Sequence, residues 1–152
     1  MKILFLDVDG VLNRCGMSSQ GLEEDKCELL SKICQRTGCV IVVSSTWRWI
    51  DHAYERLQRM FHEYGIPHIG KTEVMSEPTG KFRSDGAAIT KACPRHVEIT
   101  EWLSRHPDVT SYAIVDDDPD ADDQSGRYVA TRSYVGLGFA EAEKLVFILN
   151  QS

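Results

Sequence analysis

The sequence has no apolar stretch long enough to cross a membrane. Its longest runs, such as Cys39–Val43 and Leu145–Leu149, fall far short of the roughly 20 residues that a membrane helix needs. The five cysteines form no C-x-x-C pair, and their odd number leaves one thiol over in any disulfide scheme. We therefore expect a reducing, cytoplasmic environment. Asp7 and Asp9 interrupt the first apolar run, so we expect mature structure there rather than a signal peptide.

The chain also lacks an excess of positive charge. Seventeen Lys and Arg residues face 23 Asp and Glu residues, which gives a net charge of −6 and argues against broad, nonspecific attraction to nucleic acid. Repeats, Pro-rich linkers and the Cys and His spacings typical of zinc sites are absent as well. With 152 residues, the chain suits one domain spanning residues 1–152.

Apolar periodicity predicts alternating strands and helices. The predicted strands are Ile3–Val8, Cys39–Ser44, Tyr112–Val115 and Tyr128–Thr131, and the predicted helices cover about Leu22–Ile33, Trp49–Tyr64, Val97–His106 and Phe139–Leu149. This order predicts an α/β fold with a doubly wound, mainly parallel sheet and helices on both faces. The segment 71–94 is rich in Gly, Pro, Ser, Thr and charge, so we expect a loop or a small flap there.

Two acidic groups follow predicted strands. Asp7 and Asp9 lie at the exit of the first strand, where alternation points both to one side and Gly10 allows a tight turn. Asp116 and Asp117 follow a later strand. If both strands are central in one parallel sheet, the four carboxylates form an all-oxygen site suited to Mg²⁺.

The rest of the later acidic group is interpreted as loop residues, namely Asp118, Asp120, Asp122 and Asp123. A lone run of this kind is usually a solvated loop.

A third strand exit carries hydroxyl groups. Ser44 and Ser45 stand where a strand runs into a helix start, an arrangement that suits a phosphate but is also typical of ordinary helix caps. The sequence leaves several roles open for Trp47, which can pack in the core, stack on a base or cover the site. Arg48 can equally be a surface residue.

These three elements, D-x-D-G-x-L, V-V-S-S-T-W-R and the late V-D-D, resemble in order the motifs of the haloacid dehalogenase (HAD) superfamily, over about residues 3–120. The S-S-T-W-R and E-I-x-x-W-L-x-x-H-P segments are similar to the small HAD domains linked to RNA-repair proteins. The resemblance implies a HAD-like Rossmannoid fold with a minimal cap or none, because about 25 residues between Asn13 and the second strand leave no room for a large one.

The resemblance also implies roles for single residues in a HAD-type phosphoric monoester hydrolase. Asp7 would be the nucleophile that forms an aspartyl phosphate, and Asp9 would be the general acid and base while its main-chain carbonyl binds Mg²⁺. Ser44, with the N–H of Ser45, would hold the phosphoryl group. Asp116 and Asp117 would complete the Mg²⁺ site.

The family expects one cation near the nucleophile, which the resemblance places at Arg95, with Lys91 and Lys81 as alternatives. An uncapped site would accept a nucleotide or a nucleic-acid end phosphate as readily as a small molecule. Despite the acidic total, a local basic rim is also consistent with the sequence, formed by Arg48, Lys71, Lys81, Arg83, Lys91 and Arg95.

Three alternatives stay open. A receiver-like regulatory domain also uses an acidic pocket, Mg²⁺ and an aspartyl phosphate, although the middle strand here ends in Ser44 and Ser45 instead of an aspartate. A phosphotransferase of the same superfamily would pass the phosphoryl group to an acceptor other than water. A binding protein would keep the pocket without turnover.

Overall fold

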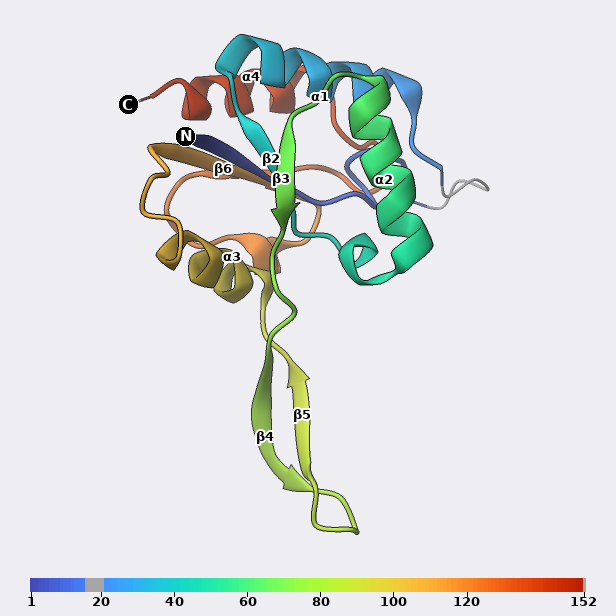
Figure 1. Cartoon of the computed structure of the whole chain (residues 1–152), viewed down its shortest axis with the longest axis vertical. Coiled ribbons are helices and arrows are strands. Elements are labelled where there is room, and N and C mark those ends of the chain that lie inside the picture. The colour runs from blue at the N-terminus through green and yellow to red at the C-terminus, as the bar shows by residue number, and fades with distance from the viewer. Residues whose placement is uncertain (16–20, 152) are drawn as a thin grey trace.

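The computed structural model describes residues 1–15 and 21–151 and contains a five-stranded parallel sheet (Figure 1). Its strands are β1 (Lys2–Leu6), β2 (Val40–Val43), β3 (His68–Lys71), β6 (Ser111–Asp116) and β7 (Tyr128–Ala130), in the spatial order β3-β2-β1-β6-β7. The helices are α1 (Glu24–Thr37), α2 (Asp51–Glu63), α3 (Arg95–Ser104) and α4 (Phe139–Leu149), with short 3-10 turns η1 (Thr46–Trp49) and η2 (Pro119–Ala121). The predicted fold class is confirmed.

Strand alternation divides the core into two layers, one on each face of the sheet. Leu4 and Leu6 of β1 point to the face covered by α1, α2 and α4, whereas Ile3 and Phe5 point to the face covered by α3. On this second face, the ring of Phe5 meets that of Trp102 edge to face, with centroids 5.5 Å apart. Because β1 is buried on both faces, its run of apolar residues is continuous, as a central parallel strand requires.

The helix α1 ends at Thr37 and is capped by Gly38. Gly38 has a φ of +74°, a left-handed conformation in which a side chain is strained, and its N–H donates to the carbonyl of Cys34 at 2.8 Å. The chain then turns directly into β2. In the described residues, α1 is therefore the one helix between the neighbouring strands β1 and β2.

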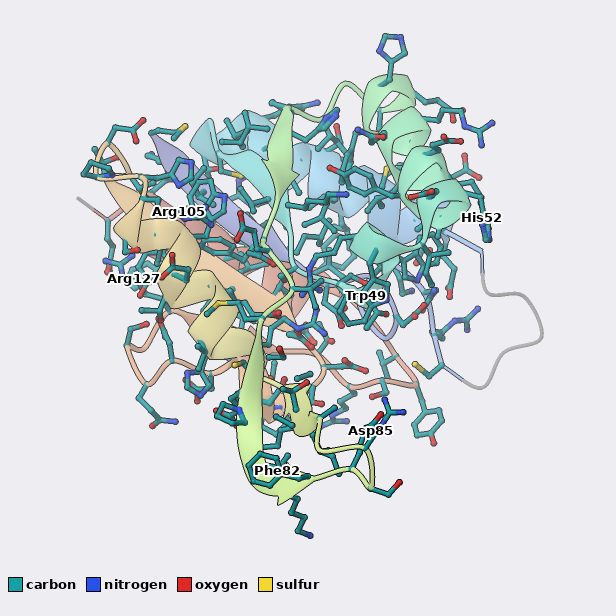
Figure 2. All side chains as sticks on the ribbon, turned by 60° about the horizontal axis from the view of Figure 1, so that its bottom comes forward. Trp49, His52, Phe82, Asp85, Arg105 and Arg127 are labelled. Atoms are coloured by element: carbon teal, nitrogen blue, oxygen red, sulfur yellow. The ribbon has the colours of Figure 1, made fainter. Side chains whose placement is uncertain are left out.

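A β hairpin projects from the body of the molecule between β3 and α3 (Figure 1). Its strands, β4 (Ser76–Phe82) and β5 (Ala88–Ala92), pair antiparallel, and every residue of β5 is exposed. Figure 2 places Phe82 and Asp85 at its far end. The hairpin occupies most of the segment 71–94, for which the sequence predicts a loop or a small flap.

Several boundaries differ from the sequence predictions by a few residues. The turn η1 takes the first residue expected in the second helix, so α2 begins at Asp51. The edge strand β3, which alternates between half-buried and exposed residues, was not predicted. Among the described residues, no helix is long and apolar enough to span a membrane.

Candidate active site

Three strand exits meet at one edge of the sheet, because β1 lies between β2 and β6 and all three run parallel. The N–H of Asp7 donates to the carbonyl of Val115 at 3.1 Å, and the N–H of Ser44 donates to the carbonyl of Leu6 at 2.9 Å. Asp116 is the last residue of β6. The backbone ladder therefore brings together side chains that are more than one hundred positions apart in the sequence.

Three carboxylates converge at this edge. Asp7, Asp116 and Asp117 each offer one oxygen, and these oxygens lie within 4.8 Å of one another. Asp7 and Asp116 are only 8% and 2% exposed. Burial, followed by the charge of Asp116 and a hydrogen bond to it, raises the pKa of Asp7 well above its usual value. Burial likewise raises the pKa of Asp116 to about 6. Without a cation, the two carboxyls favour a shared proton over two negative charges.

Gly10 is required by the close approach of Asp117. Its φ is +80°, and a Cβ added to it would lie 2.1 Å from the Oδ2 atom of Asp117. The same turn is fixed by Thr131, whose hydroxyl donates to the carbonyl of Gly10 at 2.7 Å. Ser133 donates to Asp117 Oδ2 at 2.8 Å and so orients this carboxylate. The sequence gives no sign of these roles, since Thr131 is the last residue of a predicted strand and Ser133 lies in the aperiodic segment that follows it.

Three buried side-chain polar atoms have no hydrogen-bond partner among the described residues. One is the hydroxyl oxygen of Thr72, directly after β3. The other two are the hydroxyl oxygen of Ser44, which is fully buried, and the Nη1 atom of Arg95 at the start of α3. The guanidinium of Arg95 acts on the nearby acids, because its positive charge lowers the pKa values of Asp7 and Asp116, whereas burial raises them. Buried polar groups are normally paired, so these two atoms fit an anion bound between them.

The neighbouring Ser45 has a different local role. Its hydroxyl accepts a hydrogen bond from the N–H of Trp47 at 3.2 Å and caps η1. The alternative cations, Lys81 and Lys91, belong to the projecting hairpin and are exposed. Lys91 is 3.4 Å from a carboxylate oxygen of Glu77. Of the three cations considered, Arg95 is the one that the structure brings to the acids.

Asp9 lies beside the three carboxylates, but its own side chain is bound to two other residues. Its Oδ1 accepts from the Nδ2 of Asn13 at 3.0 Å, and its Oδ2 accepts from the indole N–H of Trp47 at 3.1 Å. The three-oxygen group around Asp7 does not include the Asp9 carboxylate. This leaves the Asp9 side chain available for proton transfer.

Arg48 is buried, with a side chain that is 2% exposed, so its interpretation as a surface or rim residue was wrong. Its guanidinium donates to Glu98 at 2.7 Å and to the carbonyls of Ser44, Ser45 and Thr72 at 3.0, 2.8 and 3.1 Å. It therefore ties the end of β2 to α3. The missed signal is Glu98, the first residue of the E-I-x-x-W motif, which stands 50 residues from Arg48.

The remaining acidic residues take part in loop contacts. Asp118 caps η2 through the N–H of Asp120 at 3.0 Å, and Asp120 accepts from the N–H of Arg95 at 3.2 Å. Asp122 accepts from a loop N–H, and Asp123 accepts from the hydroxyl of Tyr112 at 2.6 Å.

The donor set fits a hard divalent cation next to a phosphoryl group. Three carboxylate oxygens provide negative charge and the oxygen ligands that Mg²⁺ prefers. Burial is the main reason that the pKa values of Asp7 and Asp116 are raised, and the charge of a neighbouring carboxylate raises each of them further; a bound cation would offset both effects. Ser44 and Arg95 supply an unpaired hydroxyl and an unpaired cationic N–H group on the adjoining side. Such an arrangement can bind and polarise a phosphate ester.

Comparison with known families supports the motif analysis. The family model described as the HAD domain in Swiss Army Knife RNA repair proteins matches residues 3–142, from β1 into α4. The range includes every strand exit described above, and the match confirms the resemblance inferred from the motifs. No curated protein and no solved structure matches the chain.

Proposed function

The chain belongs to the family of HAD domains in Swiss Army Knife RNA repair proteins, and we propose that it is a Mg²⁺-dependent phosphatase. It would hydrolyse a phosphomonoester through an aspartyl phosphate on Asp7. One observation carries the proposal: three converging carboxylates lie beside two buried, unpartnered groups, Ser44 Oγ and Arg95 Nη1. The three carboxylates suit a cation, whereas Ser44 Oγ and Arg95 Nη1 suit the phosphoryl oxygens.

In the first step, a carboxylate oxygen of Asp7 attacks phosphorus and the bond between phosphorus and the leaving oxygen breaks. Asp9 gives its proton to that leaving oxygen, so the product departs as an alcohol. Ser44, the N–H of Ser45 and Arg95 hold the phosphoryl oxygens during the transfer. Positioning and charge neutralisation provide most of the rate in reactions of this kind.

In the second step, Asp9 accepts a proton from water and the water oxygen attacks phosphorus. The bond between phosphorus and Asp7 then breaks, which releases inorganic phosphate and restores both carboxyl groups to their starting states. A Mg²⁺ ion held by Asp7, Asp116, Asp117 and the main-chain carbonyl of Asp9 would neutralise charge on the phosphoryl oxygens.

For the substrate, we propose a nucleotide or a nucleic-acid end phosphate. The matched family is that of HAD domains in RNA repair proteins, which favours a substrate related to nucleic acid. A single helix joins β1 and β2 in the described residues, so no large cap closes over the site from there. A cytoplasmic location also belongs to this proposal, and the five free cysteine thiols suit a reducing compartment.

The test is a phosphatase screen of the purified protein with phosphorylated oligonucleotides, nucleotides and sugar phosphates, each with and without EDTA. We expect phosphate release that EDTA abolishes and that Asp7→Asn eliminates almost completely. Oligonucleotide ends or nucleotides should be preferred, whereas a clear preference for sugar phosphates would refute the substrate class. An adduct that persists for minutes after treatment with acetyl phosphate would favour the receiver-like alternative instead.

A further inference from the structure

The carboxylate of Asp9 is held by donors on both of its oxygens. Asn13 donates to Oδ1 and Trp47 donates to Oδ2, at 3.0 and 3.1 Å. The orientation of the Asn13 amide is fixed in turn, because its Oδ1 accepts from the N–H of Gly10 at 2.9 Å. The indole N–H can only donate. Each oxygen of Asp9 therefore keeps one further lone pair that is not used by these two contacts.

Trp47 comes from a different strand exit than Asp9. It belongs to η1, directly after the serines that end β2, and its own N–H is bound to Ser45 Oγ at 3.2 Å. The indole is 7% exposed and belongs to the apolar core cluster. The guanidinium of Arg56 lies over the ring, 5.6 Å from its centroid. These contacts confine the ring, so its N–H is a fixed donor.

We propose that Trp47 is a positioning residue for the general acid, an inference that rests on the proposed phosphatase function. Its N–H fixes the rotation of the Asp9 carboxyl group about the bond to Cβ, so that the proton carried at an otherwise unused lone pair of Asp9 points at the leaving oxygen. Trp47 links the turn η1, which Ser45 caps, to the carboxylate of Asp9, so this turn also determines how the Asp9 carboxylate is oriented. In the described part of the chain, the indole N–H of Trp47 donates to Asp9 and no hydrogen bond joins it to Asp7 or Asp117.

A positioning role has a signature that a packing role lacks. Proton donation by Asp9 matters most for a poor leaving group such as an alkyl alcohol, and matters little for nitrophenolate, which leaves without a proton. Loss of the Trp47 N–H should therefore lower kcat/KM for an alkyl phosphate and spare kcat/KM for p-nitrophenyl phosphate. The ratio kcat/KM reports the first transfer only, whereas kcat also includes the hydrolysis of the aspartyl phosphate that both substrates share. Damage to packing or to phosphate binding would affect both substrates alike.

The test compares wild type with Trp47→Phe, which keeps an aromatic ring and removes the donor. We expect kcat/KM to fall about 10- to 100-fold for an alkyl phosphate, the effect of one charge-assisted hydrogen bond, and less than about threefold for p-nitrophenyl phosphate. In an Asp9→Asn background, Trp47→Phe should cause no additional loss, because the acid that it positions is already absent.

Trp102→Phe is the matched control, since it removes an indole from the opposite core layer, where the ring packs against Phe5. If Trp47→Phe fails to fold, benzothienylalanine placed at the same position by stop-codon suppression keeps the ring shape and replaces N–H by sulfur.

Equal losses on the two substrates, or an additive loss with Asp9→Asn, would overturn the role of Trp47 while leaving the phosphatase proposal intact. A wild-type protein with no Asp7-dependent turnover on either substrate would overturn both.

Discussion

Breaking the buried ion pair between Arg48 and Glu98 should destabilise the protein strongly. Their side chains are 2% and 4% exposed, and the Nη2 atom of Arg48 is 2.7 Å from Glu98 Oε1. The other carboxylate oxygen of Glu98 accepts from the N–H of Met75 at 2.8 Å. Glu98→Gln keeps the side-chain volume, but it leaves the buried guanidinium without a counter-charge and can place an amide donor against a backbone donor.

Removal of one partner from a buried pair costs about 3–5 kcal/mol of unfolding free energy. For a domain of this size, each kcal/mol lowers Tm by roughly 2–4 °C, so we expect a fall of about 6–20 °C. Replacing both partners, as in Arg48→Met with Glu98→Leu, should recover part of the loss because no unpaired charge remains buried.

The assay is urea unfolding followed by circular dichroism, with Glu101→Gln as the control on the same helix. Glu101 faces Arg105 at 3.5 Å, but both side chains are nearly half exposed, so the control should change the unfolding free energy by less than about 1 kcal/mol. A Glu98→Gln variant as stable as this control would refute the reasoning, since it would mean that the pair contributes no more than a surface contact.

Three further predictions concern the carboxylates. Mg²⁺ should raise Tm of the wild type through preferential binding to the folded state, and a thermal melt of Asp117→Asn should show little of this increase. Gly10→Ala should abolish the Mg²⁺-dependent Tm increase and turnover, because its Cβ would lie 2.1 Å from Asp117 Oδ2 at a φ of +80°; normal activity would contradict the turn geometry. The pKa of Asp116 is raised by burial to about 6. Since the folded state then holds the proton more tightly than the unfolded chain, this group's contribution to stability is lost as the pH rises from about 4 to 6. Urea midpoints without metal should therefore fall from pH 5 to pH 7, and a rise over this range would argue against the raised pKa.

The parts of the site that follow sheet geometry were predictable from the sequence. Asp7 and Ser44 directly follow apolar strands and Asp116 is the last residue of one, and parallel strands expose their carboxyl ends at one edge. The helix and strand predictions succeeded for the same reason, because buried strands and amphipathic helices leave clear periodic patterns.

Contacts between loops left no such pattern. Ser133 reaches Asp117 from a segment without periodicity, and the indole N–H of Trp47 reaches Asp9 across 38 positions. Arg48 was misjudged because charged residues are mostly exposed, and its burial depends on a partner in a distant helix. The strand β4 contains Pro78 and Gly80, which are uncommon inside strands and favour a loop interpretation.

The base of the hairpin β4–β5 is held by hydrogen bonds that do not involve the strands themselves. The N–H of Cys93 donates to the carbonyl of Met75 at 2.9 Å, and the N–H of Met75 is itself anchored to Glu98. The two chain ends at this neck are therefore joined to each other and to the protein body before the strands extend outward (Figure 1). Shortening the arm beyond the neck is thus a way to vary its reach while the sheet and the carboxylate cluster keep their own supports.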